Sequence, residues 1–477
     1  TSVDGNTAKL VVTAEELLWL AADGYDVSGA EEQPRRPIAT PGAKGLGVYH
    51  SYASLTLELQ AYAAAYGAGQ NGNPDICRLV SLGKSVEDRE IWAVKISDKP
   101  DKEQFEPEFR YISTMHGDEP VGTELCLYFI DTLLTEYGND SRIANLVDGM
   151  EIWIVPLMNP DGLEAVTRFN HDGIDLNRDF PTWPEEIGGK IFDGAPLDDA
   201  GRAAETRRIM QWSAAQSFVL SANFHTGARI VNYPFDDDDK GSGMDAPSAD
   251  DALLQELSLR YSTPNSPMYN DPVPSSPGGV INGSLWYEIT GGMQDWNYRY
   301  LSCNDVTIEL SPTKIPNENE LPGLWDNNRE SMLAYAEASH IGVNGIVKDR
   351  TTNEPLYARI EVVGNPQTVF TDPDVGDYHR LLLPGTYDLR ISAPGYKTKR
   401  KRDVVVVDGE AVKVNVKLKP SPIKTDINGD GKTNALDIQR LVTALLNDPN
   451  DKSCDVDSDG TLTVSDLQLI VRNVNTQ

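Results

Sequence analysis

The sequence is poor in cysteine. Only four of its 477 residues are cysteine, and they stand far apart, at Cys77, Cys126, Cys303 and Cys454. Small secreted domains that depend on disulfides carry a denser set, and many zinc sites are built from Cys-x-x-Cys pairs. The count therefore excludes a disulfide framework and a cysteine-based metal site.

Long apolar runs are absent as well, and positive charge is scarce. No apolar stretch is long enough to span a bilayer, and we expect any signal peptide to have been removed before Thr1. The 42 basic residues face 73 acidic ones, which gives a net charge of -31. This charge argues against nucleic acid and anionic membranes as partners. We predict neither a nucleic-acid partner nor a transmembrane segment.

The chain is too long for a single hydrophobic core, so we expect several domains. Residues 1–40 contain a short amphipathic helical pattern at 15–22 and a linker at 33–37, and we predict an N-terminal extension there. From 41 to 340, helical patterns alternate with apolar runs, which predicts an α/β domain. The expected helices include 55–66 and 123–137, and the expected strands include 109–113, 151–156, 218–224 and 305–310.

The remaining chain divides into two smaller units. Residues 341–420 alternate apolar and polar side chains between Gly, Pro and Asp turns, which predicts a small β-sandwich. Residues 421–477 contain a duplicated loop in which oxygen-bearing side chains recur at every second position before a glycine. This spacing is typical of a twelve-residue calcium loop. We predict two calcium ions, bound by Asp426, Asn428, Asp430, Asp437, Asp455, Asp457, Asp459 and Asp466.

The tandem calcium loops differ from an ordinary EF-hand pair. No entering helix precedes either loop, and Asp437 and Asp466 replace the usual final Glu. This loop-then-helix duplication resembles dockerin modules, which bind cohesin domains in extracellular enzyme assemblies. The resemblance implies secretion and a cohesin-type partner, although intramolecular docking of the tail on the sandwich is an alternative. The pairs at 435–436 and 464–465 depart from the Ser-Thr pair of many cohesin-binding dockerins.

Three residues of the α/β region have the chemistry of a catalytic zinc site. His116 and Glu119 lie three residues apart directly after an expected strand, and His225 ends another. Ligands in α/β domains gather at the carboxyl ends of strands. Two imidazoles and one carboxylate leave a fourth zinc position open for water, whose pKa then falls to about 7. We predict one zinc ion and metal-assisted hydrolysis.

Hydrolysis of a peptide also needs a base. Glu309, at the end of the expected strand 305–310, is the candidate for this base. A glutamate at such a position is equally often a structural residue that only flanks a buried strand.

A family resemblance covers residues 49–339. The segments that carry it are His116-Gly-Asp-Glu119, Met158-Asn-Pro-Asp-Gly162, Asp175-Leu-Asn-Arg-Asp-Phe-Pro181, Asn223-Phe-His-Thr-Gly227, Gly292-Met-Gln-Asp-Trp-Asn-Tyr298 and Thr307-Ile-Glu-Leu-Ser311. In this order and spacing they resemble the zinc metallocarboxypeptidases, in particular the regulatory subfamily with carboxypeptidases N, E and D. The resemblance implies a mixed-sheet catalytic domain, followed by a transthyretin-like β-sandwich.

The resemblance also implies roles for single residues. His116, Glu119 and His225 would carry zinc, Glu309 would act as general base, and Arg168 would polarise the scissile carbonyl. The residues expected to grip the free C-terminal carboxylate of a peptide or protein substrate are Asn177, Arg178 and Tyr298. A guanidinium suits that task because its donors are planar and bidentate.

Substrate preference has a marker of its own. Asp236, in Tyr233-Pro-Phe-Asp236, matches the aspartate of subfamily members that remove C-terminal lysine or arginine. A buried carboxylate would favour a basic side chain and disfavour an apolar one. Two other functions stay open: hydrolysis of diaminopimelate-type cell-wall peptides, and a non-catalytic extracellular binding protein.

Two departures from the subfamily stand out. Thr226 replaces the usual glycine, and no cysteine pair follows Ser311, so we expect no disulfide near the site and a free, buried thiol at Cys303.

Overall fold

The computed structural model describes residues 2–4, 7–9, 48–67, 73–182, 197–237, 241–271, 276–421, 425–429, 432–448, 451–456 and 462–475. The helix predicted at 15–22 and the linker at 33–37 lie outside these ranges. Ser2–Asp4 (β1) and Thr7–Lys9 (β2) pair as a short antiparallel hairpin. Among the described helices, none combines the length and the apolar character that a membrane crossing would need.

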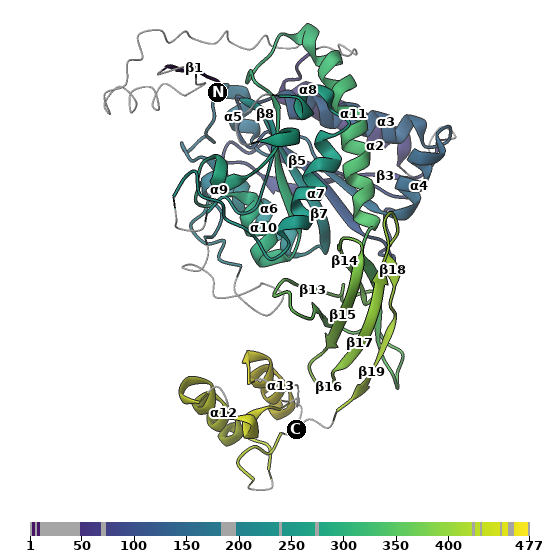
Figure 1. The fold of residues 1–477 in the computed structure, drawn as a ribbon, viewed down its shortest axis with the longest axis vertical. Helices are drawn as coiled ribbons and strands as arrows, with labels where there is room; N and C mark the ends of the chain where they lie inside the picture. The colour runs from purple at the N-terminus through teal and green to yellow at the C-terminus, as the bar shows by residue number, and fades with distance from the viewer. Residues whose placement is uncertain are drawn as a thin grey trace.

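An eight-stranded mixed sheet forms the centre of the largest unit (Figure 1). Its strand order is β3-β4-β6-β5-β7-β10-β8-β9. The four central strands are parallel, whereas β3, β4 and β8 join the sheet antiparallel. The strands are Cys77–Lys84 (β3), Glu90–Ile96 (β4), Glu108–Ser113 (β5), Glu151–Val155 (β6), Phe218–His225 (β7), Ala228–Tyr233 (β8), Val280–Asn282 (β9) and Asn304–Ser311 (β10). The four strands that the sequence predicted are therefore confirmed, and so is the mixed α/β class.

Helices cover both faces of this sheet, which explains why its central strands are buried along their whole length. Neighbouring residues of β5 point to opposite faces, so that Tyr111 belongs to one apolar cluster and Ile112 to another. The Tyr111 cluster is closed by Tyr52–Tyr66 (α2), Val121–Glu136 (α3), Asp251–Ser262 (α7) and Leu321–Glu337 (α11). The Ile112 cluster is closed by Ala204–Ala214 (α6) and Met293–Leu301 (α10). Shorter helices are Ser141–Gly149 (α4), Pro160–Ala165 (α5) and Gly283–Trp286 (α9).

The described part of the proline-rich stretch 262–279 contains two short ordered turns. Ser266–Tyr269 forms a helical turn (α8), and Pro277–Gly279 forms a 3-10 turn (η4). Pro267 fits α8 because a proline in the first turn sacrifices no hydrogen bond. The Asn265 side chain caps the turn by accepting from the Met268 amide at 3.1 Å, and Met268 is fully buried.

A two-layered β-sandwich follows the α/β unit. One sheet has the order β14-β11-β19-β16 with β18 beside β11, and the other has the order β13-β12-β15-β17. The apolar faces of the two sheets enclose one cluster that includes Val347, Ile360 and Leu389. The strands are Val343–Asp349 (β11), Arg359–Val362 (β12), Thr368–Phe370 (β13), Asp377–Arg380 (β14), Gly385–Ser392 (β15), Tyr396–Lys397 (β16), Lys399–Val406 (β17), Val412–Lys413 (β18) and Val416–Pro420 (β19).

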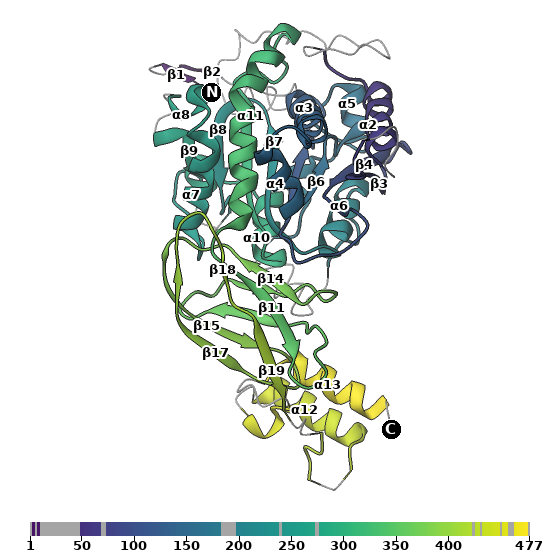
Figure 2. The ribbon, with the colours of Figure 1, turned by 90° about the vertical axis from the view of Figure 1, so that its right-hand side faces the viewer.

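The third unit consists of two helices, Ala435–Asn447 (α12) and Val464–Asn475 (α13). They share a small core that includes Leu441, Cys454 and Ile470. Figures 1 and 2 show these helices beyond the end of the sandwich that is remote from the α/β unit.

A buried ion pair joins the sandwich to the α/β unit. The Arg380 guanidinium of β14 donates to Asp250 Oδ1 at 2.6 Å, and both side chains are almost fully buried. The Asn365 amide donates to the same oxygen at 2.7 Å, and Gln367 donates to the Tyr298 carbonyl at 2.8 Å. These contacts fix the sandwich against the loop before α7 and against α10.

We expect Arg380→Met to lower the free energy of unfolding by about 3–5 kcal/mol, because Asp250 would stay buried without its cation. Urea unfolding of the full chain measures the effect. The matched control is Arg260→Met, which removes an ion pair between the same two units. Its partner, Asp408, has a side chain that is 76% exposed, so its loss should cost less than about 1 kcal/mol. Equal losses in the free energy of unfolding of the two variants would show that the buried Arg380–Asp250 pair does not stabilise the interface more than an exposed pair does.

Candidate metal centre and active site

Three side chains from separate segments meet at the carboxyl edge of the central strands. His116 follows β5, Glu119 stands just before α3, and His225 is the last residue of β7. His225 Nδ1 lies 3.0 Å from His116 Nδ1 and 3.0 Å from Glu119 Oε2, and His116 Nδ1 lies 3.2 Å from Glu119 Oε1. All three residues are buried.

This arrangement fits a zinc ion. Zinc–ligand bonds of about 2.1 Å in a tetrahedral site separate neighbouring ligand atoms by roughly 3.4 Å, close to the distances found here. Two imidazole nitrogens and one carboxylate are also a donor set that zinc prefers. Among the described residues, His116, Glu119 and His225 form the one potential metal cluster that contains histidine.

The charge states of Glu119 and His225 suit a cation. Burial opposes ionisation of Glu119, but His116, His225 and Lys314 outweigh it and hold the pKa of this carboxyl well below its usual range. Burial lowers the pKa of His225 to about 4, so its imidazole is neutral and can act as a ligand near pH 7.

A second layer of side chains orients the three ligands. Asp175 Oδ1 lies 3.0 Å from His116 Nε2, which leaves Nδ1 of the same ring to face the metal position. The Arg168 guanidinium donates to Asp175 Oδ2 at 2.8 Å, and its Nη1 lies 3.2 Å from His116 Nδ1. Burial opposes the charge of Asp175, but His116, Arg168 and Arg178 dominate and hold its pKa far below the usual range.

Lys314 and Thr226 complete this layer, and no motif in the sequence predicts a role for either residue. The Lys314 ammonium is buried, 2.8 Å from Asp118 and 3.3 Å from Glu119 Oε1. The Thr226 amide donates to Glu119 Oε2 at 3.1 Å, and its hydroxyl donates to the Lys314 carbonyl at 2.9 Å. The threonine that departs from the usual glycine therefore ties two loops together at the site.

Glu309 stands beside the metal ligands because of strand register. In the parallel pair of β10 and β7, Glu309 is the direct partner of His225. Its Oε2 is buried and has no hydrogen-bond partner among the described residues. Burial and the nearby Glu119 carboxylate raise the pKa of Glu309 to about 8. A group of this pKa can both accept and return a proton near neutral pH.

These residues line one pocket. It also contains the predicted Arg168, Asn177, Arg178 and Asp236, but not Tyr298. The Tyr298 hydroxyl instead lies 3.1 Å from Asp250 Oδ2, at the base of the sandwich.

The aromatic hydroxyl that does line the pocket belongs to Tyr287. The sequence reading began its motif at Gly292 and so passed over the Trp-Tyr pair just before it. Gly291, at φ +77°, lets the Tyr287 loop approach the Arg178 loop. A Cβ at Gly291 would lie 2.5 Å from the Arg178 carbonyl oxygen, so a larger residue would push the two loops apart.

Asp236 forms a buried acidic end of the pocket. Its Oδ1 accepts from the Gln294 amide at 2.7 Å, and only 4% of the residue is exposed. Gly283 leaves room for this carboxylate, since a Cβ there would lie 1.9 Å from Oδ1. Burial and the neighbouring Asp295 raise the pKa of Asp236 well above its usual range, against the effect of Arg178. A cation that entered here would relieve both effects.

The predicted calcium ligands are described in part. Asp437 Oδ1 accepts from the Ile427 amide at 2.8 Å, and Asp466 Oδ1 accepts from the Val456 amide at 2.7 Å. The two aspartates thus close their loops in the same way, each in the first turn of its helix. Asp426, Asn428 and Asp455 also lie in the described residues, whereas Asp430, Asp457 and Asp459 lie outside them.

Comparison with known families agrees with this geometry. The zinc carboxypeptidase family model matches residues 64–331, which is more than half of the chain. The chain belongs to the zinc carboxypeptidase family. A carboxypeptidase regulatory-like domain matches 342–419 and a dockerin type I domain matches 424–475. These families imply a zinc site and calcium binding, and the predicted resemblance is confirmed.

Individual relatives cover the first two units. Carboxypeptidase D from Homo sapiens is 40% identical over 404 residues, which are 80% of this chain but 28% of that protein. The chain therefore spans little more than a quarter of that relative. The carboxypeptidase N catalytic chain from Homo sapiens is 38% identical over 383 residues, covering 74% of this chain and 83% of that protein. The crystal structure of carboxypeptidase A from Helicoverpa armigera has a TM-score of 0.49 and 20% identity, covering 68% of this chain and 80% of that one.

The four cysteines are all free and buried. The expectation of an unpaired, buried Cys303 is confirmed, and the described structure has no disulfide near the site.

We expect Asp175→Asn to weaken zinc binding by about 10–100-fold, because His116 would lose the carboxylate that fixes its ring. Zinc retained after dialysis against graded chelator concentrations measures this change. Asp172→Asn, on the exposed side of the same turn, serves as the control and should bind zinc like the wild type. The orienting role of Asp175 fails if the two variants retain zinc equally.

Proposed function

We propose that this protein is an exopeptidase that hydrolyses the last peptide bond of a chain and prefers C-terminal lysine or arginine. The observation that carries the proposal is the buried Asp236 carboxylate in the same pocket as His116, Glu119, His225 and Glu309. The family assignment supports the hydrolytic part, and the charge of Asp236 supports the basic preference.

The free carboxylate of a substrate has suitable partners in this pocket. Arg178 is exposed and, within the described part of the chain, has no carboxylate at ion-pair distance, so its guanidinium is available for a bidentate contact. Asn177 lies beside it, with its carbonyl accepting from Arg178 at 2.8 Å. We assign the aromatic contact to Tyr287 instead of Tyr298, because Tyr287 shares the pocket. These contacts select a chain end over an internal bond.

The reaction follows from the positions of the charged groups. His116, Glu119 and His225 would hold the zinc ion, which would supply a water of lowered pKa and a Lewis acid for the carbonyl. Glu309 accepts a proton from the attacking water and later donates it to the leaving amine. The Arg168 guanidinium stabilises negative charge that develops on the carbonyl oxygen, and Asp175 holds Arg168 in place.

The tail supports an extracellular setting. We propose that the protein is secreted and binds one zinc and two calcium ions. We further propose that the dockerin unit binds a cohesin-type partner, with docking of the tail on its own sandwich as the alternative. The dockerin match supports the partner class, and Leu436 and Val464, both more than half exposed, offer apolar contact area on α12 and α13.

We expect Glu309→Gln to lower kcat on a C-terminal arginine peptide by about 10²–10⁴-fold while zinc content is unchanged, because the amide cannot take up a proton. Steady-state kinetics and metal analysis of the same sample measure both quantities. Glu136→Gln, at the exposed end of α3, is the control. An unchanged rate in Glu309→Gln would refute its role as the general base, and a wild type without zinc and without activity would support a non-catalytic binding protein.

We expect Asp236→Asn to lower kcat/KM for arginine-ended peptides by at least about 100-fold, because a buried ammonium or guanidinium without its carboxylate costs about 3–5 kcal/mol. Peptides that end in leucine should lose far less. Parallel assays of both peptides measure the ratio, with Asp237→Asn as the control from the same acidic run.

A third substrate distinguishes the preference for C-terminal lysine or arginine from the alternative, hydrolysis of cell-wall peptides. A peptide that ends in diaminopimelate carries an additional carboxylate, which Asp236 would repel. If the wild type cleaves this peptide as fast as the arginine peptide, the preference for lysine or arginine is refuted although the exopeptidase assignment stands.

A further inference from the structure

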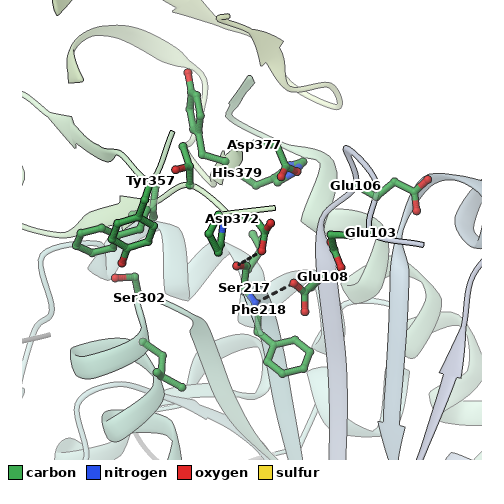
Figure 3. Close-up of a pocket in the computed structure, with 17 residues that line it drawn as sticks. Glu103, Glu106, Glu108, Ser217, Phe218, Ser302, Tyr357, Asp372, Asp377 and His379 are labelled. Carbon is green, nitrogen blue, oxygen red and sulfur yellow. Dashed lines mark hydrogen bonds and ion pairs between the residues drawn. The ribbon is translucent and has the colours of Figure 1, made fainter. Parts of the chain in front are cut away.

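A second cavity lies between the α/β unit and the sandwich, remote from the residues assigned to catalysis. It encloses about 50 Å³, more than the 10–15 Å³ or so that a single water needs. Figure 3 shows that its labelled polar residues come from both units. Glu103, Glu108 and Ser217 belong to the α/β unit, and Asp372 and Asp377 belong to the sandwich.

Three carboxylates converge in this cavity. Glu103, Glu108 and Asp372 each offer an oxygen, and these atoms all lie within 4.8 Å of one another. Ser217 links two of them, since its amide donates to Glu108 Oε1 at 2.8 Å and its hydroxyl donates to Asp372 Oδ2 at 3.1 Å (Figure 3). The Asp374 amide donates to Asp372 Oδ1 at 2.7 Å, so this carboxylate is held in a fixed orientation.

Two carboxylate oxygens at the cavity are buried and unused. Glu108 is 3% exposed, and its Oε2 has no hydrogen-bond partner among the described residues. Asp377 is also 3% exposed, and its Oδ1 has no hydrogen-bond partner within the described ranges. A buried acceptor without a donor destabilises the fold, and more so when it is charged. Such atoms in a cavity wall point to a missing partner.

The protein does not supply that partner from its described residues. The nearby Lys95 ammonium is committed to Glu151 at 2.6 Å, and His379 lies 3.1 Å from Asp377 Oδ2. Glu103, Glu108 and Asp372 have no ion pair in the described part of the chain. Burial and the other carboxylates raise the pKa of Glu108 well above its usual range. The cluster therefore lacks positive charge.

We propose that Glu103, Glu108 and Asp372 bind a calcium ion that bridges the α/β unit and the sandwich. The donors are all oxygen, which selects a hard cation over zinc or copper. Three carboxylates supply three to six oxygens, and the cavity leaves room for waters to complete the six to eight ligands that calcium takes. Magnesium suits the site less well, because it demands a compact octahedron at about 2.1 Å.

A bound calcium ion would join elements that the sequence keeps far apart. Glu108 begins β5, the strand that leads to His116, whereas Asp372 lies between β13 and β14 of the sandwich. The ion would thus stabilise the same interface as the Arg380–Asp250 pair, through contacts made only when calcium is present.

The test measures calcium uptake by the full chain. Because the dockerin loops should also bind calcium, all variants carry Asp437→Asn and Asp466→Asn. In this background we expect one calcium ion per chain by equilibrium dialysis, with a Kd below about 1 mM, as in other extracellular modules. Adding Glu108→Gln and Asp372→Asn should abolish this uptake. We also expect millimolar calcium to raise the melting temperature of the background protein more than equimolar magnesium does. The two substitutions should abolish this rise.

The controls keep every outcome decisive. Asp408→Asn changes another carboxylate between the same two units and should leave calcium uptake unchanged. If the Glu108 and Asp372 variant does not fold, Glu103→Gln alters an exposed residue and should weaken calcium binding at least tenfold. Calcium uptake that survives the Glu108, Asp372 and Glu103 substitutions refutes the site. A background protein that takes up no calcium refutes it too, and a gain of stability on acidification would then show that protons satisfy the carboxylates instead.

Discussion

The structure of the active site depends on one buried negative charge, the carboxylate of Glu119. A buried carboxylate costs several kcal/mol unless cations and hydrogen-bond donors surround it. His116, His225 and Lys314 lie within 3.3 Å of its oxygens, and the Thr226 amide donates to it. These partners come from the ends of β5, β7 and β10, so the parallel register of the central strands is what allows the charge to be buried. A zinc ion would join a cluster that already concentrates charge of both signs.

The convergence of the candidate metal ligands could be predicted from the sequence because they follow apolar strands whose ends must meet at one sheet edge. His116, Glu119 and His225 indeed converge, and the central strands were predicted to within a residue or two. Tyr287 and Lys314 could not be found in this way, since their positions depend on the path of long loops. Tyr298 was predicted to contact the substrate from its place in a motif, but the motif does not reveal the direction in which α10 points its side chain. That helix directs Tyr298 toward Asp250 instead of the pocket.

The sequence predicted that this unit is a β-sandwich, but it predicted only some of the strands. Clear alternation marked β11, β12, β15 and the run 411–418, which contains β18 and most of β19. By contrast, β17 begins with Lys399-Arg-Lys-Arg402 and has few apolar side chains. This strand forms because β15 pairs with it at the edge of the sheet, where solvent reaches charged side chains on β17. Exposed edges commonly carry lysine, which discourages pairing with another chain. Tertiary pairing thus overrides the local pattern, and no reading of the isolated segment would recover it.

Two acidic clusters in this chain contain buried carboxylates that have no ion pair within the described residues. They differ in the kind of cation that can reach them. Asp236 lies beside Asp295 at one end of a pocket that opens to peptide, so the compensating cation can be the side chain of a substrate that comes and goes. Glu108 and Asp372 lie where two units meet, and a substrate side chain would have to separate those units to reach them. A small ion meets no such obstacle, because the exposed Glu103 gives it a path from solvent. The difference in access, more than the difference in charge, is the reason that we propose recognition for one cluster and cohesion for the other.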